Sequence, residues 1–215
     1  MQLKLTDFAA RQGLALPSDA AERLLSYAQL VWQKKGFLNL TSADSLEEIL
    51  ARHVCDGLAA AACLAQRATG KESFSVADMG AGAGYIGLSI AIALPQAHVS
   101  LVESLEKRCS FLNWAVLKLG LKNVSVRQMR LGQTPLPPFD FVTERAMGQL
   151  NDILPLIAPC VAPGGLFAAY QSRPDQAEAA LLVRGGLKAL PAQAYRLPGE
   201  QKERYLALFT RADAE

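Results

Sequence analysis

Apolar residues recur every three or four positions through the first seventy residues, which is the spacing of helices with one buried face. Asp19 and Glu22 precede the first apolar set, Ser45 and Glu48 precede the second, and each pair resembles a capping box. The two sets are Leu24, Leu25, Ala28, Val31 and Trp32, and Leu50, His53, Val54, Gly57, Leu58 and Ala61. We expect two amphipathic helices joined by a loop over residues 36–42.

After Gly70 short apolar runs alternate with helix-like segments. Strands are expected over Phe74–Asp78, Val99–Glu103, Val124–Gln128, Phe139–Thr143, Gly165–Tyr170, Gln193–Arg196 and Arg204–Thr210, and helices over Leu88–Leu94, Lys107–Leu119, about Ile153 and over Gln176–Arg184. Such alternation predicts parallel pairing in a doubly wound α/β sheet. The last two strands should close it as a hairpin with an antiparallel edge strand.

Length and composition fit one good-sized domain with a short appendage, since the 215 residues are 51% hydrophobic and 20% charged. We expect a helical extension over residues 1–70 and one compact domain over residues 71–215. No uncharged apolar run reaches the roughly 18 residues that cross a bilayer, and we expect a cytoplasmic protein, a monomer that does not bind membranes. The four cysteines lack a C-x-x-C pair and should be free thiols, and two histidines do not make a histidine-rich metal centre. We expect no metal.

Positive charge is concentrated between residues 100 and 130. The basic residues there are Lys107, Arg108, Lys118, Lys122, Arg127 and Arg130, against the acids Glu103 and Glu106. This stripe fits a polyanionic partner, or is merely a solvated helix face.

A glycine-rich loop joins the first predicted strand to the next helix, and it fits two patterns. Residues 82–87 read G-x-G-x-x-G, the dinucleotide-binding pattern, and residues 78–84 read D-x-G-x-G-x-G, the loop of S-adenosylmethionine (AdoMet) methyltransferases. Asp78 would repel a pyrophosphate, and the chain is too short for a second nucleotide-binding half and a substrate domain. AdoMet is therefore favoured over NAD, although Asp78 could simply cap the turn.

Glu103 ends the second predicted strand, 19 positions after Gly84. A carboxylate there can accept both ribose hydroxyls of an adenosine, in either ligand. Because ligands of open α/β sheets bind at the carboxyl ends of the strands, residues 128–132 and 143–146 should complete the pocket.

Several separated segments together resemble the RsmG/GidB family of small-subunit (16S) ribosomal RNA methyltransferases. They are NLTS (39–42), RHVCD (52–56), DMGAGAGYIG (78–87), LVESLEKRCSFL (101–112), LKNVSVRQMR (121–130) and FDFVTERA (139–146). The resemblance implies the seven-stranded, Rossmann-like AdoMet-dependent methyltransferase fold. It also implies methyl transfer from AdoMet to N7 of a guanine, with ribosomal RNA or the small subunit as partner.

The resemblance also implies roles for individual residues. Asp78, Gly80, Gly82, Gly84 and Tyr85 would form the cofactor loop, Glu103 would hold the ribose, and Leu131 and Gly132 would border the adenine. Arg145 would lie beside the methionine end of the cofactor and the entering base, as the catalytic residue. Asn39, Thr41, Arg52, His53, Lys107, Arg108 and Arg130 would surround the mouth where RNA arrives.

The chain departs from the family pattern at five positions. Ile86 stands where a proline is usual, and Gly57 where a serine is usual. Gly132 replaces the usual acid, and Glu144 replaces a small polar residue. Gln171 lies where a lysine is expected after the fifth strand, and Arg173 could take the role of that lysine. We expect Ile86 to loosen the loop and Glu144 to add negative charge near the mouth. These changes concern the target nucleotide more than the cofactor.

Methylation of guanine N7 needs no general base, because the atom carries a free lone pair and no proton. The residues must therefore position the reactants rather than move protons. Three alternatives stay open: a methyltransferase acting on another RNA, one acting on a small molecule, and a non-catalytic AdoMet- or RNA-binding protein. For Arg145 the alternative is a salt bridge to Asp140 or Glu144, and for His53 it is a place in the core.

Overall fold

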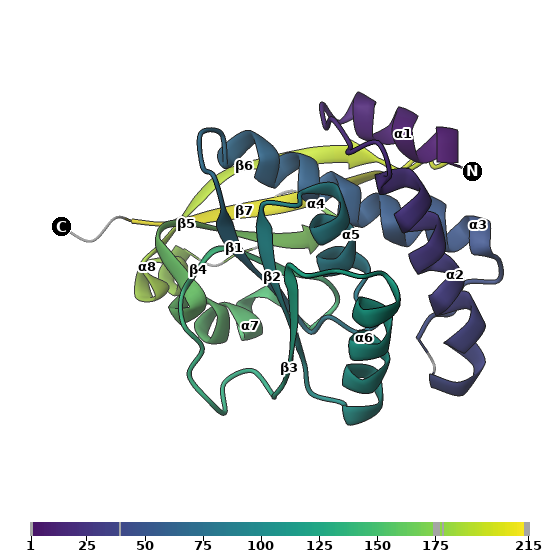
Figure 1. Ribbon diagram of the computed structural model, residues 1–215. Coiled ribbons are helices and arrows are strands. Elements are labelled where there is room, and N and C mark those ends of the chain that lie inside the picture. The colour runs from purple at the N-terminus through teal and green to yellow at the C-terminus, as the bar shows by residue number, and fades with distance from the viewer. Residues whose placement is uncertain (1, 39, 174–176, 178, 213–215) are drawn as a thin grey trace.

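The computed structural model describes residues 2–38, 40–173, 177 and 179–212 (Figure 1). The helical elements are α1 (Gln2–Arg11), α2 (Ala20–Leu38), α3 (Leu46–Glu48), the π-helical turn η1 (Ile49–Val54), α4 (Cys55–Arg67), α5 (Tyr85–Ala93), α6 (Glu106–Lys118), α7 (Leu150–Ile157), the 3-10 turn η2 (Ala158–Cys160) and α8 (Ala179–Gly185). The strands are β1 (Phe74–Met79), β2 (Ala97–Glu103), β3 (Val124–Gln128), β4 (Phe139–Glu144), β5 (Val161–Gln171), β6 (Leu187–Arg196) and β7 (Glu203–Arg211). The predicted alternation of strands and helices is confirmed.

The seven strands form one sheet in the order β3-β2-β1-β4-β5-β7-β6. β1 pairs in parallel with β2 and β4, whereas β7 is antiparallel to both β5 and β6. The expected closing hairpin with antiparallel pairing at the edge is confirmed, and β6, the earlier of its two strands, forms the edge. Burial explains this order: Leu206–Phe209 of β7 are fully covered, while most positions of β6 are at least partly exposed.

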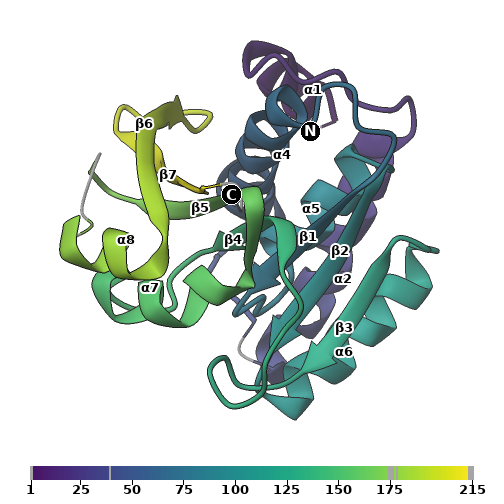
Figure 2. The same cartoon turned by 90° about the vertical axis from the view of Figure 1, so that its left-hand side faces the viewer.

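Helices cover both faces of the sheet (Figure 2). One face carries α5, α6 and the N-terminal helices, and the other carries α7 and α8. Every residue of α5 is buried, as expected of a helix that is apolar on all sides. It lies between the sheet and the N-terminal helices, whose apolar residues from Leu5 to Ala68 belong to the same core. A division of the chain at residue 70 stays a prediction.

The segment between α2 and α4 differs from its prediction. Helix α2 continues through Leu38, so the connection between the helices starts after Leu38 and not at Gly36 as predicted. Ser45 caps α3 as expected, because its hydroxyl accepts the Glu48 N–H at 3.0 Å. The Glu48 carboxylate, however, accepts the Asp44 N–H at 2.9 Å rather than that of Ser45. Asn39, predicted at the RNA mouth, lies outside the described residues, as do Gln176 and Glu178 of the predicted last helix.

Three general expectations can be compared with the structure. All four cysteines are buried free thiols, as predicted. Within the described part of the chain, none of the helices is long and apolar enough to span a bilayer. The same residues contain no group of three or more side chains suited to hold a metal ion.

Candidate functional site

A cavity of about 330 Å³ opens where β1 and β4 end, at the carboxyl edge of the parallel strands. The predicted site residues that line it are Thr41, His53, Asp78, Gly80, Gly82, Tyr85, Arg108 and Arg145. They come from the α2–α3 connection, η1, the glycine loop, the start of α6 and the segment after β4. The fold therefore gathers eight predicted residues from five separate segments around one space.

Backbone geometry explains why the loop after β1 is rich in glycine. Gly80, Gly82 and Gly84 have φ of +66°, +59° and +85°, values that side chains disfavour. A Cβ on Gly80 would lie 2.6 Å from Met147 Cγ, and one on Gly84 would lie 2.7 Å from Leu112 Cδ2. A Cβ on Gly82 would meet nothing nearer than the Gly80 oxygen at 3.8 Å. The space above Gly82 is therefore open to a ligand.

Asp78 fastens the loop to the helix that follows it. Its carboxylate accepts the Gly87 N–H at 2.8 Å and the Thr143 hydroxyl at 3.3 Å, so the capping role left open by the sequence is observed. Burial raises the pKa of Asp78 to about 6, against the lowering effect of these bonds and of the Arg145 charge. The carboxylate still lines the cavity, with capacity to accept a donor from a ligand.

Glu103 ties the end of β2 to the glycine loop. One carboxylate oxygen accepts the Gly82 N–H at 2.9 Å, and the other accepts the N–H groups of Ser104 and Leu105 at 2.8 and 2.9 Å. Arg108 lies 3.8 Å from the first oxygen. A carboxylate has about four acceptor positions, so the oxygen facing Gly82 keeps room for a ligand hydroxyl.

Arg145 is held by an acid that the sequence did not identify as its partner. Its Nη1 lies 2.7 Å from Asp56 Oδ2, and Asp56 is only 1% exposed. The expected alternatives were wrong: Asp140 pairs with Lys71, and Glu144 accepts the Met147 N–H. A lone carboxylate inside the apolar run of α4 was the signal that could have revealed Asp56.

Asp56 is the centre of a wider network. Its other carboxylate oxygen accepts the Tyr195 hydroxyl at 2.6 Å, its main-chain oxygen accepts the Tyr170 hydroxyl at 2.8 Å, and Arg204 lies 3.4 Å from Oδ2. Buried charges are tolerated when they are paired and hydrogen-bonded in this way. The network fixes the position of Arg145 relative to β5, β6 and β7.

His53 faces the cavity rather than the core. Its ring stacks on Tyr85 with centroids 4.4 Å apart, Nδ1 lies 3.3 Å from Arg145 Nη1, and Nε2 lies 3.4 Å from the Thr41 hydroxyl. Burial, reinforced by the positive charges of Arg145 and Arg52, lowers the pKa of His53 to about 4. A neutral ring follows, with Nδ1 accepting from the guanidinium and Nε2–H donating to Thr41.

The remaining predicted residues lie outside this cavity. Gly132 adopts φ +86° in a turn closed by the Gln133 N–H and the Arg130 oxygen, beyond the end of β3 and after Leu131. Arg52 is exposed and pairs with Glu48 and Glu200. Gly84 and Glu103 do not line the cavity. Gly84 belongs to the glycine loop that lines it, and Glu103 accepts a hydrogen bond from this loop at Gly82.

The basic stripe between residues 100 and 130 is not one surface. Lys107 and Arg108 belong to the start of α6, beside the carboxyl edge of the sheet, and Arg130 follows the end of β3 at that edge. Lys118 ends α6 and Lys122 precedes β3, so both lie at the opposite edge. Parallel βαβ geometry separates them, and it leaves Lys118 and Lys122, two of the six basic residues of the stripe, far from the cavity.

The positions that depart from the family pattern have specific surroundings. Glu144 is 1% exposed, so the expectation that it adds negative charge near the mouth was wrong. Burial raises the pKa of Glu144 to about 7. The hydrogen bond from the Met147 N–H opposes this rise, and the Asp78 charge adds to it. A Cβ on Gly57 would lie 2.4 Å from Ser89 Cβ, so α4 and α5 touch where a serine would not fit. Gln171 lines a second cavity beside Arg145. Lys202 from the β6–β7 turn and Arg204 of β7 also line this cavity, whereas Arg173 does not.

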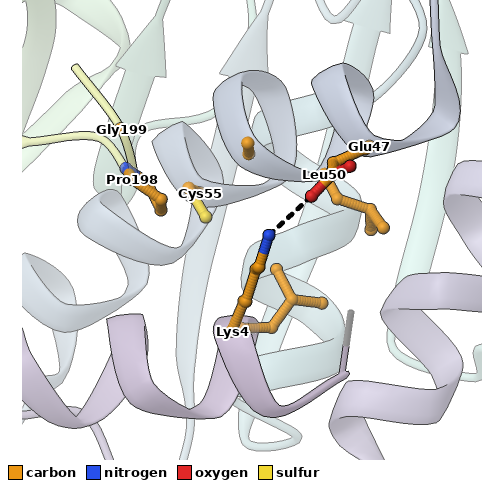
Figure 3. A pocket seen from close by; sticks show the side chains of 8 residues that line it. Lys4, Glu47, Leu50, Cys55, Pro198 and Gly199 are labelled. Atoms are coloured by element: carbon orange, nitrogen blue, oxygen red, sulfur yellow. Dashed lines mark hydrogen bonds and ion pairs between the residues drawn. The ribbon is translucent and has the colours of Figure 1, made fainter.

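Another cavity, of about 410 Å³, lies between α1, η1 and the turn after β6 (Figure 3). Leu5, Leu50 and Pro198 form apolar walls, and Lys4 and Glu47 form an ion pair of 2.6 Å across it. Burial, with a smaller effect of the Asp56 charge, raises the pKa of the Cys55 thiol to about 12, so it is no nucleophile at neutral pH. None of the predicted site residues lines this cavity.

The strand order, the antiparallel β7 and the glycine loop after β1 define a Rossmann-like methyltransferase fold. Solved structures agree: YcgJ from Bacillus subtilis has a TM-score of 0.55 and 12% identity, covering 72% of this chain and 98% of its own. TYW2 from M. jannaschii, in complex with AdoMet, has a TM-score of 0.52 and 15% identity, covering 65% of this chain and 68% of its own. At these identities the likeness concerns the fold.

The sequence comparisons place the chain more narrowly. Residues 20–188 match the profile of the GidB family, described as rRNA small subunit methyltransferase G. Relatives named ribosomal RNA small subunit methyltransferase G include those of Myxococcus xanthus (34% identity, 93% of this chain and 92% of the relative) and Cupriavidus pinatubonensis (32%, 94% and 90%). The chain belongs to this family of AdoMet-dependent methyltransferases.

Proposed function

We propose that the protein transfers the methyl group of AdoMet to N7 of a guanine in small-subunit ribosomal RNA. The observation that carries the proposal is the position of Arg145 in the cavity above the glycine loop, in a chain of the small-subunit methyltransferase G family. Its Nη1 is occupied by Asp56 and His53, while Nε and Nη2 make no hydrogen bond to a described residue. Those donors are available to a substrate.

The residues around the cavity fit AdoMet. The open space above Gly82 admits a ligand against the main chain, and Gly80, Gly84 and Tyr85 shape the rest of the loop. In the proposal Glu103 accepts a ribose hydroxyl, Leu131 and Gly132 border the adenine, and Asp78 lies toward the amino-acid end. When bound, AdoMet supplies an electrophilic methyl group on a sulfonium.

The protein then contributes orientation and charge rather than proton transfer. Guanine N7 offers a lone pair in the plane of the ring, and O6 beside it is a hydrogen-bond acceptor. Arg145 donates to O6, so that N7 points into the cofactor cavity, and neutral His53 supports the guanidinium from the other side. Holding two reactants in line supplies up to about 7–11 kcal/mol of a barrier in favourable cases.

The RNA would approach over the mouth of this cavity. Thr41, Arg52, His53, Lys107, Arg108 and Arg130 are the described residues proposed to surround it, together with Asn39. Lys107 and Arg108 lie on the correct edge of the sheet for contact with phosphates. In the proposal the protein acts as a monomer in the cytoplasm.

Mapping N7-methylguanine in small-subunit ribosomal RNA from cells with and without this protein tests the function. One guanine should lose its methyl group in the deletion strain and regain it with the wild-type protein, but not with Arg145→Ala. An unchanged map would reject the proposed substrate and leave a methyltransferase with another target.

A further inference from the structure

A second cavity of about 250 Å³ has Arg145 in its lining but none of the glycine-loop residues. Arg145 lines both cavities, so the two adjoin at this residue. The residues that matter in the second cavity are Tyr170, Gln171, Tyr195 and Lys202. Its volume is below the roughly 300–1,000 Å³ of sites for drug-sized ligands, which suits a single heterocyclic base.

Two tyrosine rings give this cavity fixed aromatic walls. Tyr170 and Tyr195 meet edge to face, with centroids 6.5 Å apart. Both hydroxyls donate to Asp56, at 2.8 and 2.6 Å, so the rings cannot turn without breaking the network that holds Arg145. Rigid aromatic surfaces beside cations are typical of sites that bind an unstacked nucleobase.

Two polar side chains of the cavity, Gln171 and Lys202, are free to bind a ligand. Among the described residues, neither the Gln171 amide nor the Lys202 ammonium group has a hydrogen-bond or ion-pair partner. Gln171 ends β5, next to the strand that leads into Arg145. An amide carbonyl can accept a hydrogen bond from the 2-amino group of guanine, and a guanidinium can donate a hydrogen bond to guanine O6.

We propose that the second cavity receives the flipped-out target guanine, with the Gln171 carbonyl accepting from its 2-amino group and Arg145 donating to O6. Lys202, at the rim, contacts a phosphate of the same RNA strand. In this position O6 and the neighbouring N7 lie at the boundary with the cofactor cavity. The inference rests on the proposed function and adds how the base is recognised.

The test compares guanosine with inosine, which lacks only the 2-amino group. Small subunits are reconstituted with ribosomal RNA carrying either nucleoside at the mapped position, and single-turnover methylation is measured with wild type, Gln171→Ala and Lys202→Ala. Wild type should prefer guanosine about tenfold, the effect of one unmade hydrogen bond. Gln171→Ala should methylate both equally, with unchanged AdoMet affinity and melting temperature.

Lys202→Ala is the matched control within the same cavity. It should weaken binding of the subunits and reduce its salt dependence by up to about one unit in the log–log slope, but keep the preference for guanosine. A preference that is the same in Gln171→Ala and wild type would overturn the inference while N7 methylation stands. Absence of N7-methylguanine with wild type on guanosine subunits would instead reject the proposed function, and the inference with it.

Discussion

Arg145 after β4 forms an ion pair of 2.7 Å with the buried Asp56 of α4, although 89 positions separate them in the chain. The pair joins the N-terminal helices to the end of the strand that leads into the candidate site. Asp56 therefore positions Arg145, and the N-terminal helices contribute a residue that holds the candidate site together.

The first prediction concerns Gly82. Gly82→Val should reduce AdoMet affinity by more than about 100-fold, because a branched side chain would fill the open space above the loop. It should also lower the free energy of unfolding by about 1–2 kcal/mol, because valine disfavours φ +59°. Gly120→Val, at φ +60° with no atom within 4 Å, is the matched control and should keep AdoMet affinity. Calorimetry and thermal unfolding give both quantities, and unchanged affinity in Gly82→Val would remove the loop from the cofactor site.

The second prediction separates the two roles of Arg145. Arg145→Lys keeps the charge beside Asp56 but loses the planar fork, so single-turnover methylation should fall roughly 30- to 150-fold, corresponding to about 2–3 kcal/mol. Arg211→Lys is a control, because Arg211 donates to the Ala158 and Val161 oxygens away from the cavity. It should affect melting and not turnover. Near-normal turnover in Arg145→Lys would leave Arg145 with a structural role alone.

The third prediction tests the ion pair itself. Asp56→Asn preserves shape and can still accept from Tyr195, but it leaves Arg145 and Arg204 without their buried counter-charge. Breaking a buried ion pair costs about 3–5 kcal/mol. Because both arginines are partly exposed to solvent, we expect Asp56→Asn to lower the free energy of unfolding by about 3 kcal/mol, the lower end of this range. Urea unfolding measures it, and a loss below about 1 kcal/mol would show that solvent compensates the arginines.

The fourth prediction follows from the raised pKa of Glu144. The folded state holds this proton more tightly than the unfolded chain, so Glu144 lowers the free energy of unfolding as pH rises from about 4.5 to about 7. Glu144→Gln should be more stable than wild type by roughly 2–3 kcal/mol at pH 8, and nearly equal to it at about pH 4.5. His53, whose pKa is lowered to about 4, acts with the opposite sign in both proteins and cancels in the difference. Equal stability of the two proteins at pH 8 would contradict the assignment. Glu22→Gln, at an exposed position of α2, serves as control.

The fifth prediction uses the division of the basic stripe. Lys107→Ala and Arg108→Ala should each reduce the salt dependence of RNA binding by roughly 0.7–0.9 in the log–log slope, the effect of one phosphate contact. Lys118→Ala and Lys122→Ala remove the same charge at the opposite edge of the sheet and should leave the slope unchanged. Equal effects of all four substitutions would mean that charge, not position, determines RNA binding.

The sequence by itself determined the order and type of the elements and the glycine loop after β1. Periodicity is a local property, so β3 was predicted to the residue and β1 to within one. The loop could be identified because positive φ at Gly80, Gly82 and Gly84 requires glycine within a short stretch. That Glu103 ends β2 was also predicted, because the carboxyl end of a strand is a local feature.

Only the tertiary structure decided which distant residues meet. The place of β7 between β5 and β6 depends on which arm of the hairpin buries more apolar surface, and the spacing of residues does not contain that choice. Burial of Glu144, pairing of Arg145 with Asp56 rather than Asp140, and separation of Lys107 from Lys122 all follow from packing across the sheet. Electrostatic partners depend on distance in space, and that distance is set by the packed sheet, not by position along the chain.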